Sequence, residues 1–420
     1  MRKRTFLELA YCYFYRMKKE SAKPNFEFIA LMASLMSIVA LSIDALLPAL
    51  SDIGIAINTL DSTDHQLLIT MIFLGLGVGQ LFFGPLSDSF GRKPIIYIGF
   101  FIFIVSSFIC VFANSLEVMI IGRILQGIGL SAARTISISI IRDTYEGNYM
   151  AKVMSFVTAF FILVPVIAPA FGKIILEHMG WQAIFYMQVF FALIVGIWFW
   201  RRQKETLHPE YKVKFTSRVF ISGVKELVKH KETLACTTIS GLITGAFLVY
   251  LSSAQHVFED QYNLKETFPY LFAALAVSIG TSTFLNGTLV LRFGMRKLAF
   301  IALITFTSLS LTYVALFWGS ANPSVLVLMI FLSLIFFCLG FIWGNMRSIA
   351  MEPIGHIAGI GAAITGFIST LVSIPIATYI GSYITITVLP LFIGLSLCGM
   401  TAIVIFLLFR QGPSEIVVEG

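Results

Sequence analysis

Charged side chains are scarce in this chain of 420 residues. Asp, Glu, Lys and Arg make up 12% of it, whereas hydrophobic residues make up 58%. A soluble domain carries roughly twice that charged fraction, and the mean hydropathy is +0.90. Most of the chain is therefore expected to lie in a lipid bilayer. The net charge of +7 does not indicate a nucleic-acid partner, because the basic residues flank the apolar runs.

Cysteine is also rare, and its spacing matches neither a metal site nor a disulfide framework. We interpret the five cysteines as small packing residues: Cys12, Cys110, Cys236, Cys338 and Cys398. The sequence contains no G-x-x-x-x-G-K-S/T run that would bind ATP, and no nucleophile–base combination. We therefore expect no enzyme activity, no cofactor and no metal.

Long apolar runs dominate what is present. With a window of about twenty residues, the sequence predicts an all-α membrane protein with twelve transmembrane helices in two six-helix bundles. The predicted spans are 27–50, 64–87, 94–113, 117–142, 151–176, 183–201, 233–255, 268–291, 297–318, 323–348, 357–380 and 385–409.

The distribution of Lys and Arg predicts the orientation. If both termini are cytoplasmic, the inner segments contain 25 of the 29 Lys and Arg residues, and the outer loops contain only Lys173 and Lys265. This asymmetry indicates that both termini are cytoplasmic. We expect a multi-pass protein of the cell inner membrane. The expected organisation is a tail (1–26), a first bundle (27–201), a cytoplasmic loop (202–232), a second bundle (233–409) and a tail (410–420).

The start of the chain is open to two interpretations. Residues 5–15 are suited to lying flat at the membrane interface, or translation begins at Met17 and leaves a short basic tail. A cleavable signal peptide is not indicated, because no small-residue cleavage site follows the apolar stretch.

A short polar loop separates the second and third runs. It reads Gly84-Pro-Leu-Ser-Asp-Ser-Phe-Gly-Arg-Lys-Pro94, and it must form a tight turn at the membrane surface. The loop resembles the signature G-x-L-x-D-R-x-G-R-R/K of major facilitator superfamily transporters, although Ser89 stands where a basic residue is usual. The resemblance implies a conformational gate made of Gly84, Asp88, Gly91, Arg92 and Lys93.

A degraded copy of this loop occurs at the equivalent place in the second half. It keeps Arg292, Gly294 and Arg296 but lacks the aspartate. Such a repeat is typical of transporters built from two related halves around a central site. We expect these residues to belong to the same gate.

Asp44 is the only carboxylate that we place well inside a predicted span. A charge at that depth costs several kcal/mol by insertion scales, so Asp44 should face a polar cavity or be protonated. We interpret it as a proton-coupling residue. The alternative is a helix-end residue at the outer surface.

The fourth span contains two arginines, Arg123 and Arg134, with Gln126 between them. The arginines are eleven residues apart and so share one helix face. Arg123 lies where the superfamily has its proton-coupling arginine, and we expect it to hold Asp44, the substrate or each in turn. Arg134 either tunes the charge of the substrate or reaches to the inner interface.

The fifth span carries Pro165-Val-Ile-Ala-Pro169-Ala-Phe-Gly172. The two prolines and the glycine predict a bent, thin helix that a neighbour can approach closely. The run resembles the antiporter motif P-x-x-A-P-x-x-G of twelve-span drug:proton exporters, with Lys173 in place of a second glycine. This resemblance favours export over import.

Further segments are similar to the Bcr/CflA branch of drug-resistance transporters, among them Gly180-Trp-Gln-Ala-Ile-Phe185 and Tyr250-Leu-Ser252. The resemblance implies proton-coupled export of small amphipathic compounds by a monomer, without ATP. We expect Gln126 and Arg134 to line the substrate cavity. Weaker candidates for the cavity wall are Tyr250, His256, Trp343, Asn345 and Tyr379.

Three alternatives remain open. The chain could export one endogenous metabolite, such as a siderophore or amino acid, or import a nutrient with protons. A more distant alternative is a membrane sensor that transports nothing, but the loops are too short to contain a signalling domain.

Overall fold

The computed structural model describes residues 25–59, 61–145, 147–212, 216–354 and 357–409. This part of the chain is almost entirely helical and contains twelve helical spans long and apolar enough to cross a membrane. The first span is interrupted and consists of α2 (Phe26–Asp44), the short η1 (Leu47–Ala49) and α3 (Leu50–Ala56). The next five are α4 (Ser62–Phe90), α5 (Arg92–Val111), α6 (Leu116–Thr144), α7 (Gly147–Met179) and α8 (Trp181–Arg202).

The second six spans begin after a polar segment. They are α10 (Lys231–Gln255) with its π-helical extension η3 (His256–Gln261), α11 (Phe268–Phe293), α12 (Met295–Phe317), α13 (Val325–Met351), α14 (Ala358–Gly381) and α15 (Leu389–Phe409). The polar segment holds η2 (Pro209–Tyr211) and α9 (Ser217–Lys229). We call residues 26–202 the first half and residues 231–409 the second half.

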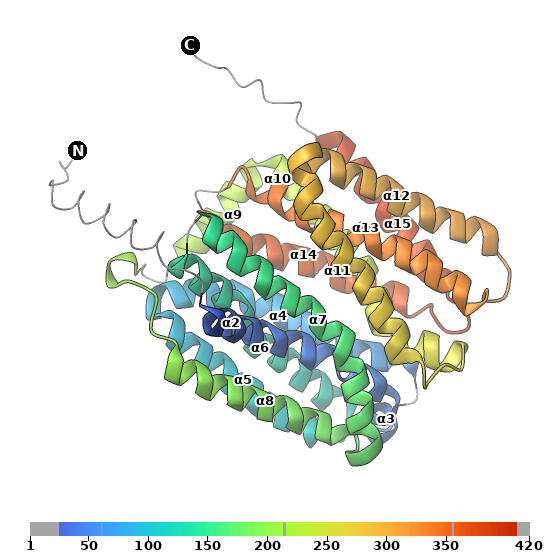
Figure 1. Cartoon of the computed structure of the whole chain (residues 1–420). Coiled ribbons are helices and arrows are strands. Elements are labelled where there is room, and N and C mark those ends of the chain that lie inside the picture. The colour runs from blue at the N-terminus through green and yellow to red at the C-terminus, as the bar shows by residue number, and fades with distance from the viewer. Residues whose placement is uncertain (1–24, 60, 146, 213–215, 355–356, 410–420) are drawn as a thin grey trace, which may run out of the picture.

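The two halves lie side by side and meet along two helix pairs (Figure 1). One pair is α4 with α14, and the other is α7 with α11. Small residues allow the first contact, because a Cβ at Gly77 of α4 would overlap Thr370 of α14. Close packing of this kind replaces the hydrophobic effect as the force between helices in lipid.

Glycines with positive φ make the single-residue turns between α4 and α5 and between α11 and α12. The φ angle is 111° at Gly91 and 77° at Gly294. Residues other than glycine rarely adopt such positive φ angles. The repeated turn glycine shows why both copies of the signature keep a glycine at this position.

The span predictions are confirmed, with ends that differ by a few residues. The first signature differs in detail, because Gly84–Phe90 is the last part of α4 and only Gly91 forms the turn. Arg347, which was counted among the inner basic residues and lies near the end of the predicted span 323–348, is inside α13. The interpretations of residues 5–15, Cys12, Met17 and the tails at 1–24 and 410–420 lie outside the described residues. The other four cysteines are buried and free, as expected.

Helix α9 was not predicted. The helix is amphipathic. Leu227 is buried in a small hydrophobic cluster with Ile354 and Ile364, whereas Ile221 and Val228 are exposed. An exposed apolar stripe on a helix with polar residues opposite is suited to the membrane interface.

Replacing Gly91 by alanine should destabilise the protein. A residue with a Cβ held in this backbone region costs about 1–3 kcal/mol, so thermal unfolding in detergent should occur at a lower temperature. Gly287 is the matched control: nothing lies within 4 Å of a Cβ added there, and Ala is the better helix former. A Gly287→Ala variant as unstable as Gly91→Ala would contradict the explanation.

Candidate functional site

The two ends of the bundle differ in their charged residues. The Gly91 turn follows the second span and the Gly294 turn follows the eighth. Because the chain crosses the membrane once per span, both turns lie at the same end of the bundle, which we call the Arg92 face. Lys173, near the end of the fifth span, belongs to the opposite end, which we call the Lys173 face.

Asp44 is the last residue of α2, at the interruption of the first span. Its side chain is only 5% exposed. Across the boundary between the halves, Tyr250 of α10 is close enough for its hydroxyl to interact electrostatically with the Asp44 carboxylate. Within the described part of the chain, the buried Tyr250 hydroxyl has no hydrogen-bond partner. Asp44 and Tyr250 therefore form a polar point where the two halves meet.

Arg123 is fully buried inside the first half. Its Nε donates to the Leu68 carbonyl at 2.9 Å, and its Nη1 donates to the Ser42 carbonyl at 3.2 Å and to Gln126 Oε1 at 2.7 Å. Among the described residues, its Nη2 has no partner and no ion pair joins it to Asp44. The guanidinium instead fixes α2, α4 and α6 around Ser42, two residues before Asp44.

Gln126 does not lie on a cavity wall, contrary to expectation. It is fully buried, its Nε2 donates to Ser107 Oγ of α5 at 2.8 Å, and its Oε1 accepts from Arg123. Because both ends of the Gln126 amide are hydrogen-bonded, its oxygen is held in place and orients the Arg123 guanidinium. Gln126 is therefore a positioning residue for Arg123.

Gly172 brings α7 against the interruption next to Asp44. A Cβ at Gly172 would overlap the carbonyl oxygen of Ala45, the residue after Asp44. Pro165 and Pro169 lie within the same continuous helix, where each removes a backbone donor. The three residues of the predicted antiporter motif thus belong to the helix that packs on the Asp44 region.

Other predicted cavity residues lie in the second half. Tyr250 packs edge-on against Phe336, with ring centroids 4.7 Å apart. The Trp343 indole contacts Phe247, and its buried Nε1 has no partner among the described residues. Asn345 is buried, and its Nδ2 donates to Asn286 Oδ1 of α11 at 2.8 Å.

Two predicted cavity residues lie elsewhere. His256 is at the Lys173 face, where Nδ1 meets Asp260 at 2.8 Å and Nε2 meets the Thr385 carbonyl at 2.9 Å. Tyr379 is 68% exposed near the end of α14, with its hydroxyl 3.2 Å from that of Tyr383. An exposed tyrosine pair at a helix end is typical of a membrane interface.

The signature residues at the Arg92 face form one network. Arg92 donates from Nε to Asp143 of α6 at 2.9 Å, from Nη1 to Ser87 Oγ at 2.7 Å, and also to Asp88. The Asp88 carboxylate lies 4.0 Å from where a Cβ would stand at Gly359 of α14. Asp88 therefore lies next to α14 of the second half. Gly84 makes only a loose contact, with Thr135.

Glu205, which the sequence analysis did not single out, caps α5. Its carboxylate accepts the backbone N–H groups of Arg92 and Lys93, both at 3.0 Å. Burial opposes ionisation of Glu205, but four backbone N–H donors outweigh it and hold its pKa below the ordinary value. Lys93 Nζ donates to the Gln203 carbonyl at 2.6 Å. The segment after α8 thus fixes the first signature.

The second signature has a similar network with different acids. Arg296 pairs with Glu232 of α10 at 3.0 Å and with Glu352 at the end of α13 at 3.2 Å. The partners of Arg92 and Arg296 at the ends of α6 and α13 correspond, which supports the repeat. Arg292 is outside this network: its guanidinium lies 5.3 Å from the centre of the Phe293 ring.

Contacts between the halves also occur at the Lys173 face. Lys173 of α7 pairs with Glu266 and donates to the Lys265 carbonyl at 3.3 Å. Gln255 of α10 donates to the Pro48 carbonyl at 3.2 Å and to Glu259 at 3.0 Å. The sequence pointed to Lys173 only as an outer basic residue and as a departure from the antiporter motif, and Gln255 was not singled out. We call these two sets of contacts the Lys173 clasp and the Gln255 clasp.

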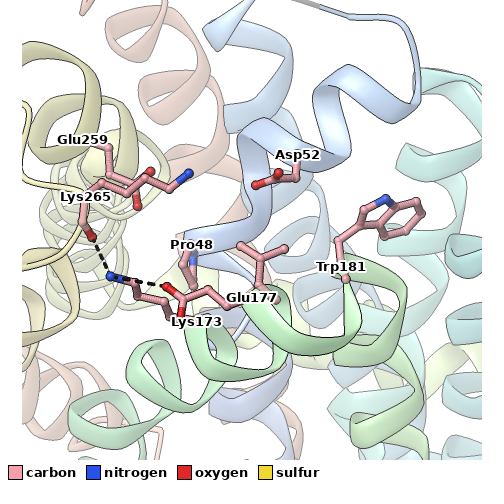
Figure 2. A pocket seen from close by; sticks show the side chains of 9 residues that line it. Pro48, Asp52, Lys173, Glu177, Trp181, Glu259 and Lys265 are labelled. Atoms are coloured by element: carbon pink, nitrogen blue, oxygen red, sulfur yellow. Dashed lines mark hydrogen bonds and ion pairs between the residues drawn. The ribbon is translucent and has the colours of Figure 1, made fainter.

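A pocket of about 280 Å³ lies beside the clasps. Figure 2 shows Asp52 on one wall, Glu259 and Lys265 on another, and the Lys173 amine reaching toward the Lys265 backbone. The Lys173 ammonium holds the pKa of the Glu266 carboxyl below its ordinary value of 4.5. The ion pair is therefore complete above pH 4.5 and is lost as the pH falls through the lowered pKa.

Replacing Lys173 by alanine should open the Lys173 face. In a cysteine-free background, a Ser252→Cys reporter, buried in α10 near the Gln255 clasp, should react several-fold faster with a membrane-impermeant maleimide when Lys173→Ala is present. Lys173→Arg keeps the charge and should keep the reaction slow. Equal rates in wild type and Lys173→Ala would show that the clasp does not hold this face shut.

Comparisons with known proteins agree with this architecture. The sequence profile of the Major Facilitator Superfamily matches residues 28–378. In three dimensions the fold is similar to the xylose transporter XylE of E. coli in an inward-open conformation, with a TM-score of 0.72 and 15% identity over 93% of this chain and 98% of that one.

Curated relatives are transporters and not enzymes. The bicyclomycin resistance protein homolog of Haemophilus influenzae is 28% identical over 67% of this chain and 71% of its own length. The multidrug resistance protein MdtL of Salmonella paratyphi C is 24% identical over 93% of this chain and 97% of its own. Together with the profile match, these findings show that the chain belongs to the major facilitator superfamily and is related to its Bcr/CflA-type multidrug transporters.

Proposed function

We propose that this protein exports small amphipathic compounds across the cell inner membrane in exchange for protons, by alternating access between the two halves. The observation that carries the proposal is Asp44: a carboxylate almost fully buried at the interrupted end of α2, facing Tyr250 of the other half. An ionisable group buried within the membrane marks a proton or substrate path by default.

The orientation follows from the Lys and Arg count. The Arg92 face is cytoplasmic in this proposal, and the Lys173 face is outside, because the basic residues concentrate between spans on the Arg92 side. The clasps at the Lys173 face then describe a state that is closed to the outside.

The reverse state requires closure of the Arg92 face. Asp88 already lies near Gly359 of α14, and Arg92 holds Asp88 and Asp143 in place. In the proposal this network latches the cytoplasmic side when the Lys173 and Gln255 clasps open. The Arg296 network supports the same closure from the second half.

Proton and cargo compete for the centre in this cycle. Asp44 takes a proton from outside when the clasps are open and releases it to the cytoplasm, where cargo enters. Arg123 donates to the Ser42 carbonyl. It therefore affects Asp44 indirectly, by fixing the backbone position of the end of α2. Gly172 allows α7 to pack directly on the backbone at Ala45, because glycine has no side chain to separate them. In the proposal a change at the end of α2 is therefore transmitted to α7.

The proposal predicts that Asp44→Asn abolishes coupling. Everted membrane vesicles are energised to an acid-inside gradient, candidate cationic, zwitterionic and anionic compounds are added, and the gradient is followed with a pH dye. A cargo should partly collapse the gradient in wild type, and Asp44→Asn should reduce this collapse to background, because the side chain can no longer carry the proton.

Glu117→Gln provides the matched control, since Glu117 is an exposed carboxylate in the first turn of α6. It should behave as wild type. Retained cargo-dependent proton movement in Asp44→Asn would remove Asp44 from the mechanism, and import of cargo under the same gradient would refute export.

A further inference from the structure

Helix α6 presents a polar stripe on its partly exposed side. Arg134, Thr135 and Ser139 are all half-buried there, within a membrane-spanning helix. The lipid-facing helices expose apolar side chains instead; on α8 these are Tyr186, Phe190, Leu193, Ile194, Ile197 and Trp200. Since an arginine does not face hydrocarbon without a counter-charge or water, the stripe of α6 lines an aqueous space.

Helix α13 of the second half has a corresponding stripe. Gly344, Arg347 and Ser348 are exposed in the part of the helix nearest the Arg92 face. Arg134 and Arg347 are close enough for their charges to repel each other. Two helices from different halves thus bring one arginine each within electrostatic range of the other.

Neither arginine has an acidic partner among the described residues. The two acids nearest the ends of these helices are already engaged, since Asp143 binds Arg92 and Glu352 binds Arg296. Two guanidinium groups that repel each other and lack a counter-charge create a site of positive potential. The group that resolves this repulsion is an anion.

Arg134 lies almost three helical turns before the end of α6. It lies ten residues before Thr144, the last residue of α6, which is about 15 Å at 1.5 Å per residue.

We propose that Arg134 and Arg347 together bind an anionic group of the cargo, a carboxylate or a phosphate-like oxyanion. This inference rests on the proposed function and adds the chemical class of the substrate. Guanidinium groups bind such oxyanions through paired, charge-assisted hydrogen bonds. Because the arginines come from different halves, a bound anion also connects the halves in the state open to the Arg92 face. The cargo is then an amphipathic anion or zwitterion.

The test uses three probes with one fluorophore and different charges: dansyl-glycine, dansyl-glycinamide and dansyl-ethylenediamine. The full-length protein is placed in phosphatidylcholine nanodiscs and titrated with each probe. Wild type should bind the carboxylate probe about tenfold more tightly than the neutral one, since a hydrogen bond to a charged group contributes about 1.5 kcal/mol or more.

Variants assign the preference to the pair. Arg134→Gln and Arg347→Gln should each remove it, and Arg134→Lys should retain part of it. Arg201→Gln removes an exposed arginine at the end of α8 and should change nothing. Equal binding of the three probes, binding of none, or an unchanged preference in the Arg134→Gln, Arg347→Gln double variant would overturn the proposal.

Two further arms separate the sources of the anion and the two proposals. If replacing part of the phosphatidylcholine by phosphatidylglycerol abolishes binding of dansyl-glycine, the pair holds a lipid headgroup and the cargo assignment is wrong. Inorganic phosphate should compete with the probe only weakly, because it lacks the apolar part. Asp44→Asn should keep the charge preference, so a failure of proton coupling and a failure of the anion site give different results.

Discussion

Within a bilayer, polar groups depend on partners inside the protein, and the three hydrogen bonds made by Nε and Nη1 of the buried Arg123 show how this constraint shapes the first half. Two of its three bonds go to backbone carbonyls, those of Ser42 and Leu68. A carbonyl cannot move without its helix, so the positions of α2, α4 and α6 are set together. The interruption of the first span that presents Asp44 lies directly beside this arrangement.

The two halves repeat the same devices with different chemistry. Positive-φ glycines make both turns, and Arg92 and Arg296 each bind an acid at or near the end of the next helix along the chain. The centre is not symmetric, because the first half supplies Asp44 and the second half supplies Tyr250. In the proposed mechanism such a centre gives protons one carboxylate to occupy, while the two arginine networks at the Arg92 face remain related by the repeat.

Hydropathy and turn chemistry were sufficient to predict the fold. The spans were predicted well because bilayer thickness sets their length. The signature was identified by its resemblance to the superfamily loop, and the structure explains its turn glycine by the positive φ of Gly91. The sites were harder. Gln126, His256 and Tyr379 were assigned to the cavity from residue type alone, and a sequence does not give the rotation of a helix about its axis.

Lys173 illustrates a signal that was present but not interpreted. It departs from the glycine usual in the antiporter motif, and the structure shows a side chain that crosses to Glu266 and Lys265 of the other half. Contacts of this kind depend on which loops meet in space, and the sequence alone does not specify that. A departure from a family pattern at a helix end is therefore a position to inspect for contacts between halves.

The most direct test of alternating access controlled by Asp44 is a pair of spin-label distances in nanodiscs. One pair, Met179→Cys and Tyr270→Cys, spans the Lys173 face, and the other, Arg201→Cys and Leu291→Cys, spans the Arg92 face; all four side chains are exposed. Lowering the pH through the titration of Asp44 should shorten the first distance and lengthen the second, and Asp44→Asn should abolish the response. Distances that do not change with pH, or that change in the same direction, would contradict the account.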